Sequence, residues 1–322
     1  MTTDHPRHRK PPLVVVVGPT ASGKTALAIE LAEEFHGEIV SADSRQVYRG
    51  MDIGTAKASP EELSRVPHHL IDMNKPTERM TLAEYKSCAD SAIQHIQDRG
   101  LLPFLVGGTG LYVKAVVDNL AIPAVPPQPE LRAKLEKLDL EELGKRLRKA
   151  DPASYETIDR KNPRRLIRAI EVSETEGVSF EHLKGSAAPK NDTLMLGLKT
   201  DPVTLEIRVR RRVDDWLQRG LLDEIRRLHD EDGVSWDRLR DFGLHYRTFA
   251  EHLNGKLGFD EAKETAVKDN IRYAKRQLTW FKQDQRIRWI TDEDHAGVLV
   301  SDWLIERASS GVRRAEVTGG RK

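Results

Sequence analysis

The stretch "LVVVVGPTASGKT", residues 13–25, decides the fold class. It opens with a short β-branched run of the type found in buried parallel strands. The next eight residues, "GPTASGKT", match the G-x-x-x-x-G-K-[ST] pattern. In "TALAIELAEEF", which follows, Leu27, Leu31 and Phe35 share one helical face. A strand, a glycine-rich loop and a helix in this order predict a P-loop.

The chemistry of such a loop is the binding of phosphates. Backbone N–H groups at a helix N-terminus favour an anion, Lys24 reaches the terminal phosphates, and the Thr25 hydroxyl can ligate Mg²⁺. The pattern does not say which molecule carries the phosphates. The predicted phosphate-binding residues are Gly18, Pro19, Thr20, Ala21, Ser22, Gly23, Lys24 and Thr25.

Outward from the loop, strands alternate with helices. We expect strands at 38–41 and 102–106, and a helix over "TLAEYKSCADSAIQHIQDRG" that ends at Gly100. This alternation predicts an α/β fold with a doubly wound parallel sheet, whose ligands gather beyond the carboxyl ends of the strands. The P-loop, "DSRQ" at 43–46 and "GGTG" at 107–110 should therefore converge on one site.

Two residues at these strand ends are candidates for chemistry. Asp43 follows an apolar strand, and it could assist a metal ion or act as a general base on an incoming nucleophile. Spacing alone does not separate the two roles. Thr109 has its hydroxyl on a flexible loop that a phosphate can approach, although the segment also fits a tight strand-to-helix turn.

The pattern changes at "AIPAVPPQPELR", where Pro123, Pro126, Pro127 and Pro129 mark a boundary. Helical pieces follow from about 130 to 182, and "TLMLGL" at 193–198 is a strand that could rejoin the sheet. We expect a catalytic core over 11–118 and 195–293, a helical insertion domain over 119–194, and disordered tails at 1–10 and 308–322.

Composition excludes several classes of protein. The single cysteine, Cys88, rules out an internal disulfide framework, and no apolar run approaches the length of a membrane span. We expect a cytoplasmic protein that is not bound to membranes. The pair His68 and His69 is interpreted as a loop anchor, because no third ligand lies at a zinc-like spacing.

The C-terminal half is helical and rich in arginine, although the formal net charge of the chain is only +1. Arg208, Arg210, Arg211 and Arg212 crowd one helix. In "IRYAKRQLTWFK", from residue 271, an apolar stripe is separate from a polar one that holds Arg272, Lys275 and Arg276. These features fit contact with phosphate or RNA, and they fit a solvated helix face equally well.

Seven segments, in consistent order from about residue 13 to 290, resemble the tRNA dimethylallyltransferases (isopentenyl transferases). They are "GPTASGKT", "SADSRQVYRGMDIGTAK", "VPHHLIDM", "LPFLVGGTGLYV", "NPRRLIRAIEV", "RVDDWLQRGLLDEI" and "YAKRQLTWF". The resemblance implies transfer of a dimethylallyl group from dimethylallyl diphosphate to the exocyclic N6 amine of the adenosine beside the anticodon, in tRNAs that read codons beginning with U. It also implies that the P-loop holds the donor's diphosphate with Mg²⁺, and that the insertion domain contacts the anticodon arm.

The resemblance also implies roles for single residues. Asp43 resembles the base that accepts the proton of the amine, Thr109 a residue that touches the target nucleotide, and Arg212 a diphosphate ligand. Catalysis is thus expected from Asp43, Lys24, Thr25, Thr109 and Arg212. The expected tRNA contacts are Asp43, Ser44, Arg45, Gln46, Thr109, Arg132, Asn162, Pro163, Arg164, Arg165, Leu166, Arg272, Lys275 and Arg276.

Three segments depart from the family's pattern: "DFGLHYR" at 241–247 in place of an "IGY" segment, Ile271 before Arg272 in place of threonine, and "TDP" at 200–202. They put the tRNA contacts in doubt more than the chemistry. Three other readings stay open: a P-loop kinase of a small metabolite that uses ATP, an enzyme that prenylates free adenine nucleotides, and a non-catalytic RNA-binding protein gated by a nucleotide. Nothing in the sequence demands more than a monomer.

Overall fold

The computed structural model describes residues 9–122, 125, 128–177, 179–183, 185–291 and 294–318 of the chain. The chain divides into two compact units, one made of residues up to Val113 and from Lys190 on, the other of Lys114–Pro189. The second unit begins and ends a few residues before the insertion that the sequence suggests. Of the four boundary prolines, only Pro129 lies within the described residues, where it is the first residue of a helix.

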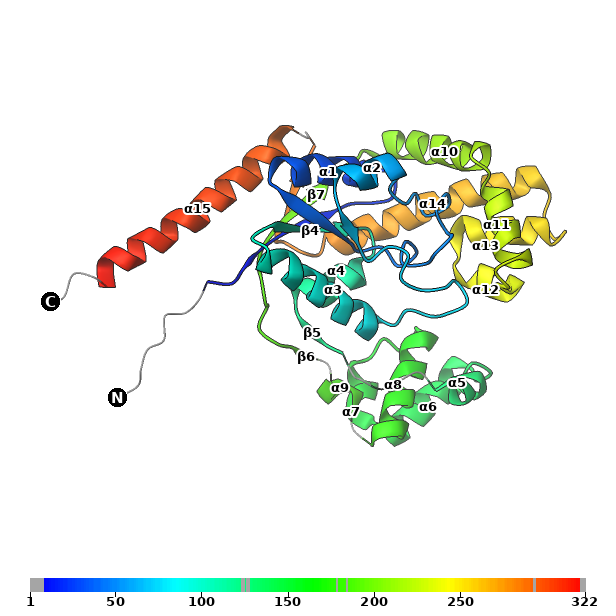
Figure 1. Ribbon diagram of the computed structural model, residues 1–322. Coiled ribbons are helices and arrows are strands. Elements are labelled where there is room, and N and C mark those ends of the chain that lie inside the picture. Colours follow the sequence, from blue (N-terminus) through cyan, green and yellow to red (C-terminus); the bar gives the residue numbers. More distant parts are fainter. Residues whose placement is uncertain are drawn as a thin grey trace. The chain divides into compact units, whose positions relative to one another are not determined.

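A six-stranded parallel sheet forms the centre of the first unit (Figure 1), which confirms the predicted fold class. The strand order is β3-β2-β4-β1-β7-β8. The strands are β1 (Pro12–Val17), β2 (Gly37–Ser41), β3 (His68–His69), β4 (Leu102–Gly107), β7 (Asp192–Leu198) and β8 (Ile287–Ile290). From Leu13 to Val17, β1 is completely buried between β4 and β7, as its unbroken β-branched run predicts.

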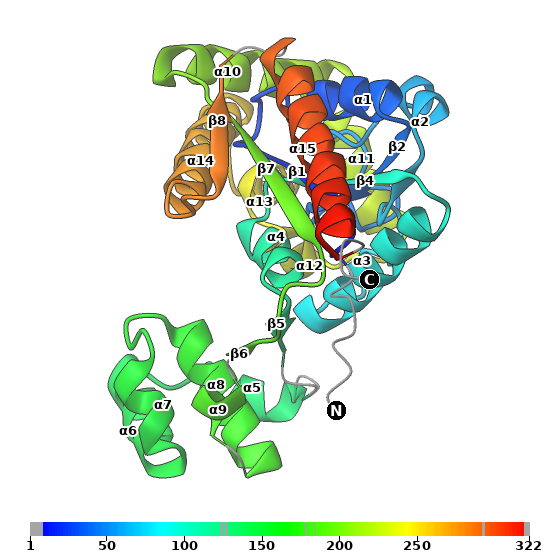
Figure 2. The same ribbon diagram turned by 90° about the vertical axis from the view of Figure 1, so that its left-hand side faces the viewer.

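Helices cover both faces of this sheet. On one face α1 (Lys24–Glu34) and α15 (Asp294–Thr318) share a hydrophobic cluster with the strands (Figure 2). Opposite them lies α3 (Leu82–Asp98), which begins at a capping box formed by Thr81 and Glu84. Two further helices are α2 (Pro60–Arg65) and α4 (Gly110–Val117). The helix α15 includes residues 308–318, which were expected to be an irregular tail; residues 1–8 and 319–322 lie outside the described part.

A helical layer adjoins the sheet and has a hydrophobic core of its own. It consists of α10 (Pro202–Gln218), α11 (Leu221–Asp230), α12 (Trp236–Asp241), α13 (Leu244–Leu253) and α14 (Phe259–Phe281). The "TDP" segment has a local explanation, since the Asp201 carboxylate caps α10 and Pro202 occupies its first position. Val47 and Met51, which follow β2, are part of the same core, so the layer is packed onto the sheet.

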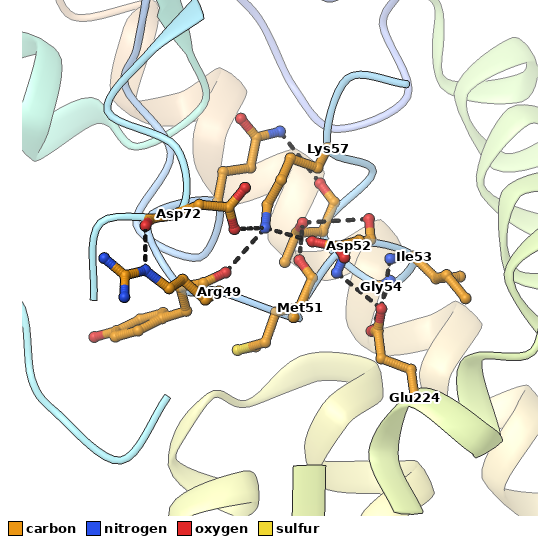
Figure 3. Close-up of polar contacts among 12 residues, drawn as sticks. Arg49, Met51, Asp52, Ile53, Gly54, Lys57, Asp72 and Glu224 are labelled. Carbon is orange, nitrogen blue, oxygen red and sulfur yellow. Dashed lines mark hydrogen bonds and ion pairs between the residues drawn. The ribbon is translucent and has the colours of Figure 1, made fainter. Parts of the chain in front are cut away.

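Glu224 on α11 holds the loop Gly50–Lys57 in place (Figure 3). Its buried carboxylate accepts the backbone N–H groups of Asp52, Ile53 and Gly54 at 2.8, 2.7 and 3.2 Å, and the Tyr246 hydroxyl at 2.6 Å. Charge-assisted hydrogen bonds of this kind are about twice as strong as neutral ones. The helical layer thus fixes the backbone of the loop 50–57, which lies in the connection between the strands β2 and β3 of the sheet.

Lys57 secures the other end of this loop (Figure 3). Its ammonium is nearly inaccessible to solvent and lies 2.5 Å from Asp52 Oδ1 and 2.6 Å from Asp72 Oδ1. It also donates to the Tyr48 carbonyl oxygen at 2.9 Å. The loop is therefore anchored at both ends by buried charged groups.

The second unit is a small helical bundle with a short antiparallel ribbon. Its elements are α5 (Pro129–Leu135), α6 (Leu140–Ala150), α7 (Pro152–Thr157), α8 (Pro163–Glu176), α9 (Phe180–Leu183), β5 (Leu120–Ala121) and β6 (Gly185–Ser186). The amphipathic pieces found in the sequence become α6 and α8, and Leu143, Leu147, Leu166 and Ile170 meet in its core. Among the described residues, no helix is both long and apolar enough to span a bilayer.

The contacts of Glu224 lead to a prediction about stability. Glu224→Gln should lower the free energy of unfolding by about 2–3 kcal/mol, because the amide turns one acceptor into a donor that faces backbone N–H groups. Thermal unfolding followed by circular dichroism measures this change. Glu231→Gln, on the exposed end of the same helix, should unfold with the wild type. Equal stability of the two variants would contradict the role given to Glu224.

Candidate active site

A cavity of about 640 Å³ lies in the first unit, beyond the carboxyl ends of β1, β2 and β4. Its wall includes the P-loop, the segment after β2, and residues of α10, α13 and α14. Open α/β sheets bind their ligands at this edge. The three polar segments predicted to converge do so, since residues 20–25, Asp43, Arg45, Gln46 and Gly107 all line this cavity.

The P-loop has the predicted form, a turn between β1 and α1. Gly23 precedes α1 with a φ of 94°, in the left-handed region that glycine adopts without strain. Residues 20–25 line the cavity, whereas Gly18 and Pro19 do not. Unpaired N–H groups at the start of a helix favour an anion in this position.

Lys24 is a partly buried cation that donates to the Pro19 carbonyl oxygen at 3.3 Å. Burial disfavours its charged form and the nearby Arg212 repels it, while Asp43 attracts it. Together these effects lower the pKa of Lys24 to about 8. An anionic ligand would relieve this cost, so the charge of the residue fits phosphate binding.

Arg212 on α10 faces the P-loop across the cavity. Its Nη1 donates to Thr20 Oγ1 at 2.9 Å, and burial lowers the pKa of its guanidinium. Arg208 and Arg211 also line the cavity, whereas Arg210 points away and pairs with Glu264 at 3.1 Å. The arginine cluster is thus divided into three residues on the cavity and one on the outer face of the helix.

Asp43 lies between the P-loop and the turn after β4. Its Oδ1 accepts the Arg45 N–H at 2.9 Å. The Thr109 hydroxyl accepts the N–H of Ser44 at 3.0 Å and lies 3.4 Å from the Ser44 hydroxyl. Thr109 therefore anchors the backbone beside Asp43 and does not itself line the cavity.

Arg45 and Gln46, both predicted to contact tRNA, are already engaged by the protein. The Arg45 guanidinium donates twice to the Phe242 carbonyl oxygen, at 3.0 and 2.8 Å, and lies over the Tyr273 ring. The Gln46 amide accepts from Ser41 at 2.8 Å and donates to the carbonyl oxygens of the Gly50–Lys57 loop. Both side chains shape the cavity wall.

The helix α14 presents two different faces. Arg272, Lys275 and Arg276 are exposed on its outer face, as the polar stripe predicts, and none of them lines the cavity. The inner face carries Gln277, whose Oε1 accepts the Thr20 N–H and whose Nε2 donates to the Gly108 carbonyl oxygen, both at 2.8 Å. One helix therefore joins an exposed basic surface to the P-loop.

In the second unit the predicted tRNA contacts have different structural roles. Arg132 is held by the fully buried Glu171, at 3.0 and 2.9 Å, and Asn162 caps α8, of which Pro163 is the first residue. The exposed side chains are those of Arg164 and Arg165. For Leu166 the prediction is wrong, because its side chain lies in the hydrophobic core of the unit and cannot reach a ligand at the surface.

Several residues of the cavity were not identified from the sequence. Gln277 lies within the quoted "YAKRQLTWF", and its position three residues after Ala274 places it on the buried stripe of α14. His245 of "DFGLHYR" lines the cavity against Trp216, with 4.1 Å between ring centroids. Burial lowers its pKa to about 3, so the imidazole is neutral. In the sequence, the signal that could have identified His245 was the departure of this segment from the family's pattern.

The two adjacent histidines form the short edge strand β3. The Nδ1–H group of His68 donates to the Val66 carbonyl oxygen, 2.8 Å away, and the residue lines the cavity. His69 Nε2 lies 2.7 Å from Glu38 Oε2. Within the described part of the chain, no group of three or more histidine, cysteine or carboxylate side chains is arranged to hold a metal ion.

Comparisons with known proteins agree with this geometry. The family model described as IPP transferase matches residues 46–284. A tRNA dimethylallyltransferase of Roseiflexus sp. (strain RS-1) is 43% identical over 302 residues, covering 91% of this chain and 99% of that protein. One from Symbiobacterium thermophilum is 44% identical over 287 residues, covering 87% and 89%.

Solved structures extend the likeness to three dimensions. The tRNA isopentenylpyrophosphate transferase of Bacillus halodurans superposes with a TM-score of 0.69 at 36% identity, covering 95% of this chain and all of that one. A eukaryotic dimethylallyltransferase described as acting on tRNA gives a TM-score of 0.73 at 26% identity, covering 94% and 80%. The chain therefore belongs to the tRNA dimethylallyltransferase (IPP transferase) family.

Proposed function

We propose that this chain is a transferase that moves a dimethylallyl group from dimethylallyl diphosphate to the N6 amine of the adenosine 3′ of the anticodon in tRNAs. Family membership over about nine-tenths of the chain supports this assignment. The observation that carries it is one cavity whose wall holds a phosphate-binding loop, two partly buried cations and Asp43. We extend the substrates to tRNAs that read codons beginning with U, as the resemblance implies.

In the proposed reaction the donor's diphosphate lies on the P-loop. Lys24, Arg212 and the backbone N–H groups at the start of α1 bind its oxygens and stabilise the negative charge that grows as the carbon–oxygen bond breaks. The N6 nitrogen forms the new bond to the same carbon. Asp43 accepts the proton that this nitrogen loses, and free diphosphate is the second product.

Mg²⁺ fits this site as a companion of the diphosphate. Thr25 Oγ1 is at the P-loop position that ligates the ion, and Mg²⁺ is usually held by few protein groups together with phosphate oxygens and water. A donor set of one protein hydroxyl, completed by diphosphate oxygens and water, agrees with that habit. When bound, the ion would neutralise charge on the departing diphosphate.

The nature of the acceptor is supported by the two faces of α14 and by the second unit. The exposed Arg272, Lys275 and Arg276 form a basic surface on a helix whose other face reaches the cavity. Prenylation of a free adenine nucleotide would need neither this surface nor the exposed Arg164 and Arg165. A target base inside a folded RNA loop has to be flipped out of its stack to reach such a cavity.

The three other hypotheses are less well supported. A kinase would need ATP on the P-loop, whereas Asp43 placed beside a diphosphate is suited to accept a proton from an amine. A non-catalytic RNA-binding protein leaves that aspartate without a role.

We propose that the enzyme acts as a monomer in the cytoplasm, where its tRNA substrates are made.

The proposed function is tested by incubating the protein with dimethylallyl diphosphate, Mg²⁺ and an unmodified tRNA transcript that reads codons beginning with U. Mass spectrometry of the digested tRNA should show one dimethylallyl group on the adenosine 3′ of the anticodon. A parallel reaction with free AMP should give far less product. Absence of prenylated tRNA from several such transcripts would refute the proposal.

The role of Asp43 as base leads to a prediction. Asp43→Asn should lower kcat by about 10²–10⁴-fold, because the amide cannot take the proton, while its oxygen still accepts the Arg45 N–H and keeps the loop in place. The dissociation constant of dimethylallyl diphosphate, measured by calorimetry, should change little. Asp237→Asn, at a highly exposed position of α12, serves as the control. Wild-type turnover by Asp43→Asn would remove this residue as the base.

The lowered pKa of Lys24 leads to a prediction about pH. The ammonium loses its proton as pH rises through about 8, and the neutral amine binds diphosphate poorly. Donor affinity should therefore fall about tenfold between about pH 7 and about pH 9. In Lys24→Arg the guanidinium stays charged throughout this range, so its affinity should not vary with pH. A pH-independent dissociation constant for the wild type would show that Lys24 does not carry the interaction.

A further inference from the structure

The side chain of Gln277 connects the P-loop to the turn that follows β4. Its Oε1 accepts the N–H of Thr20 in the P-loop, and its Nε2 donates to the carbonyl oxygen of Gly108, each at 2.8 Å. Gln277 is only 6% exposed and lines the cavity. A buried amide that uses both its donor and its acceptor on backbone groups of two loops fixes the distance between them.

On the donor side, Thr20 links this amide to the cations that bind phosphate. Its hydroxyl accepts from Arg212 Nη1 at 2.9 Å. The same residue therefore receives one hydrogen bond from α10 and gives another to α14. The position of the P-loop relative to Arg212 depends on both contacts.

On the acceptor side, Gly108 belongs to the turn 107–110, which is bound to the segment that carries Asp43. The Thr109 N–H donates to the Ala42 carbonyl oxygen at 3.1 Å, and its hydroxyl accepts from Ser44. A Cβ on Gly107 would lie 2.2 Å from the Ala42 oxygen, so the two backbones are already in contact. A displacement of the turn therefore has to displace the backbone on both sides of Asp43.

The helix α14 packs so closely against the turn 107–110 that no space is left between them. A Cβ on Gly108 would lie 2.2 Å from Gln277 Nε2, and one on Gly110 would lie 2.2 Å from the ring of Trp280, which is nearly one helical turn further along. The outer face of the same helix bears the exposed basic residues. A ligand that binds this outer face thus acts on a helix in direct contact with both loops.

We propose that Gln277 is a positioning residue that couples the binding of the two substrates, so that RNA on the outer face of α14 tightens the hold of the P-loop on diphosphate. The inference rests on the proposed function, since it takes tRNA and a diphosphate donor as the ligands. Coupling of this kind is reciprocal: the factor by which RNA strengthens diphosphate binding is the factor by which diphosphate strengthens RNA binding. Neither ligand needs to touch Gln277 for this effect.

The experiment measures binding of inorganic diphosphate with Mg²⁺ by calorimetry, with and without a saturating unmodified tRNA transcript. For the wild type we expect the dissociation constant to fall roughly 5–50-fold when RNA is present, within the usual range of coupling between sites. In Gln277→Met both hydrogen bonds are lost while the volume is kept, and the ratio should fall to within about twofold of one. Gln277→Ala leaves room for water molecules that can form hydrogen bonds with the Thr20 N–H and the Gly108 carbonyl oxygen. This variant should therefore keep the fold but lose the direct connection, and its ratio should also fall to within about twofold of one.

Gln283→Met, an exposed glutamine just after the end of the same helix, should keep the wild-type ratio. If Gln277 only stabilised the fold, the variants would unfold at lower temperature while the ratio stayed as in the wild type, and that result would overturn the inference. A ratio of one in the wild type would overturn it as well. Because the ligands are bound rather than turned over, a missing prenylated product together with an intact coupling ratio would count against the proposed function alone.

Discussion

Two partly buried cations on one cavity are the constraint on which this site depends. Lys24 and Arg212 repel each other, and burial further disfavours the charge on each, as their lowered pKa values show. A bound anion offsets that cost, as do the nearby carboxylates of Asp43 and, for Arg212, Asp215. The sheet supplies the framework that holds them: the P-loop follows its central strand, Asp43 follows β2, and α10 brings Arg212 from the helical layer. The cavity is suited to a group with several negative charges that lies beside the carboxylate of Asp43.

Helices of the added layer hold the loops that form this cavity. Glu224 fixes the Gly50–Lys57 loop, and Gln277 fixes the P-loop against the turn after β4. Both side chains are buried and act on backbone groups, so their effect does not depend on the identity of the loop side chains. The helical layer therefore contributes more than a basic surface: it sets the geometry in which donor and acceptor meet.

Much of this arrangement follows from local patterns. The β-branched run at 13–17, the P-loop pattern and the alternation of strands with helices predict the parallel sheet, its ligand-binding edge and the convergence of three segments there, because these properties depend on period and order along the chain. The roles of Arg208, Arg210 and Arg212 could not be assigned in the same way. Residues four apart share one face of a helix and residues two apart do not, but only the tertiary packing decides which face lines the cavity.

Contacts between residues that lie far apart in the sequence were the main part of the structure that could not be predicted. Nothing in the sequence near Gln277 or Glu224 shows that their partners lie 257 and 172 positions away, and both were overlooked. Leu166 was assigned to a surface because it lies within a motif, whereas the apolar period of α8 places it in the core. The short strand β3 escaped notice as well, because two residues are too few to show a period.

The central claim is that the P-loop holds the leaving group of a prenyl donor and not a nucleotide that is split. Phosphorus-31 NMR of a reaction that contains dimethylallyl diphosphate, ATP, Mg²⁺ and tRNA distinguishes the two most directly. The account predicts that one inorganic diphosphate appears for each prenylated tRNA while the ATP signals stay constant. Conversion of ATP to ADP in step with the modification of tRNA, with no free diphosphate, would contradict it.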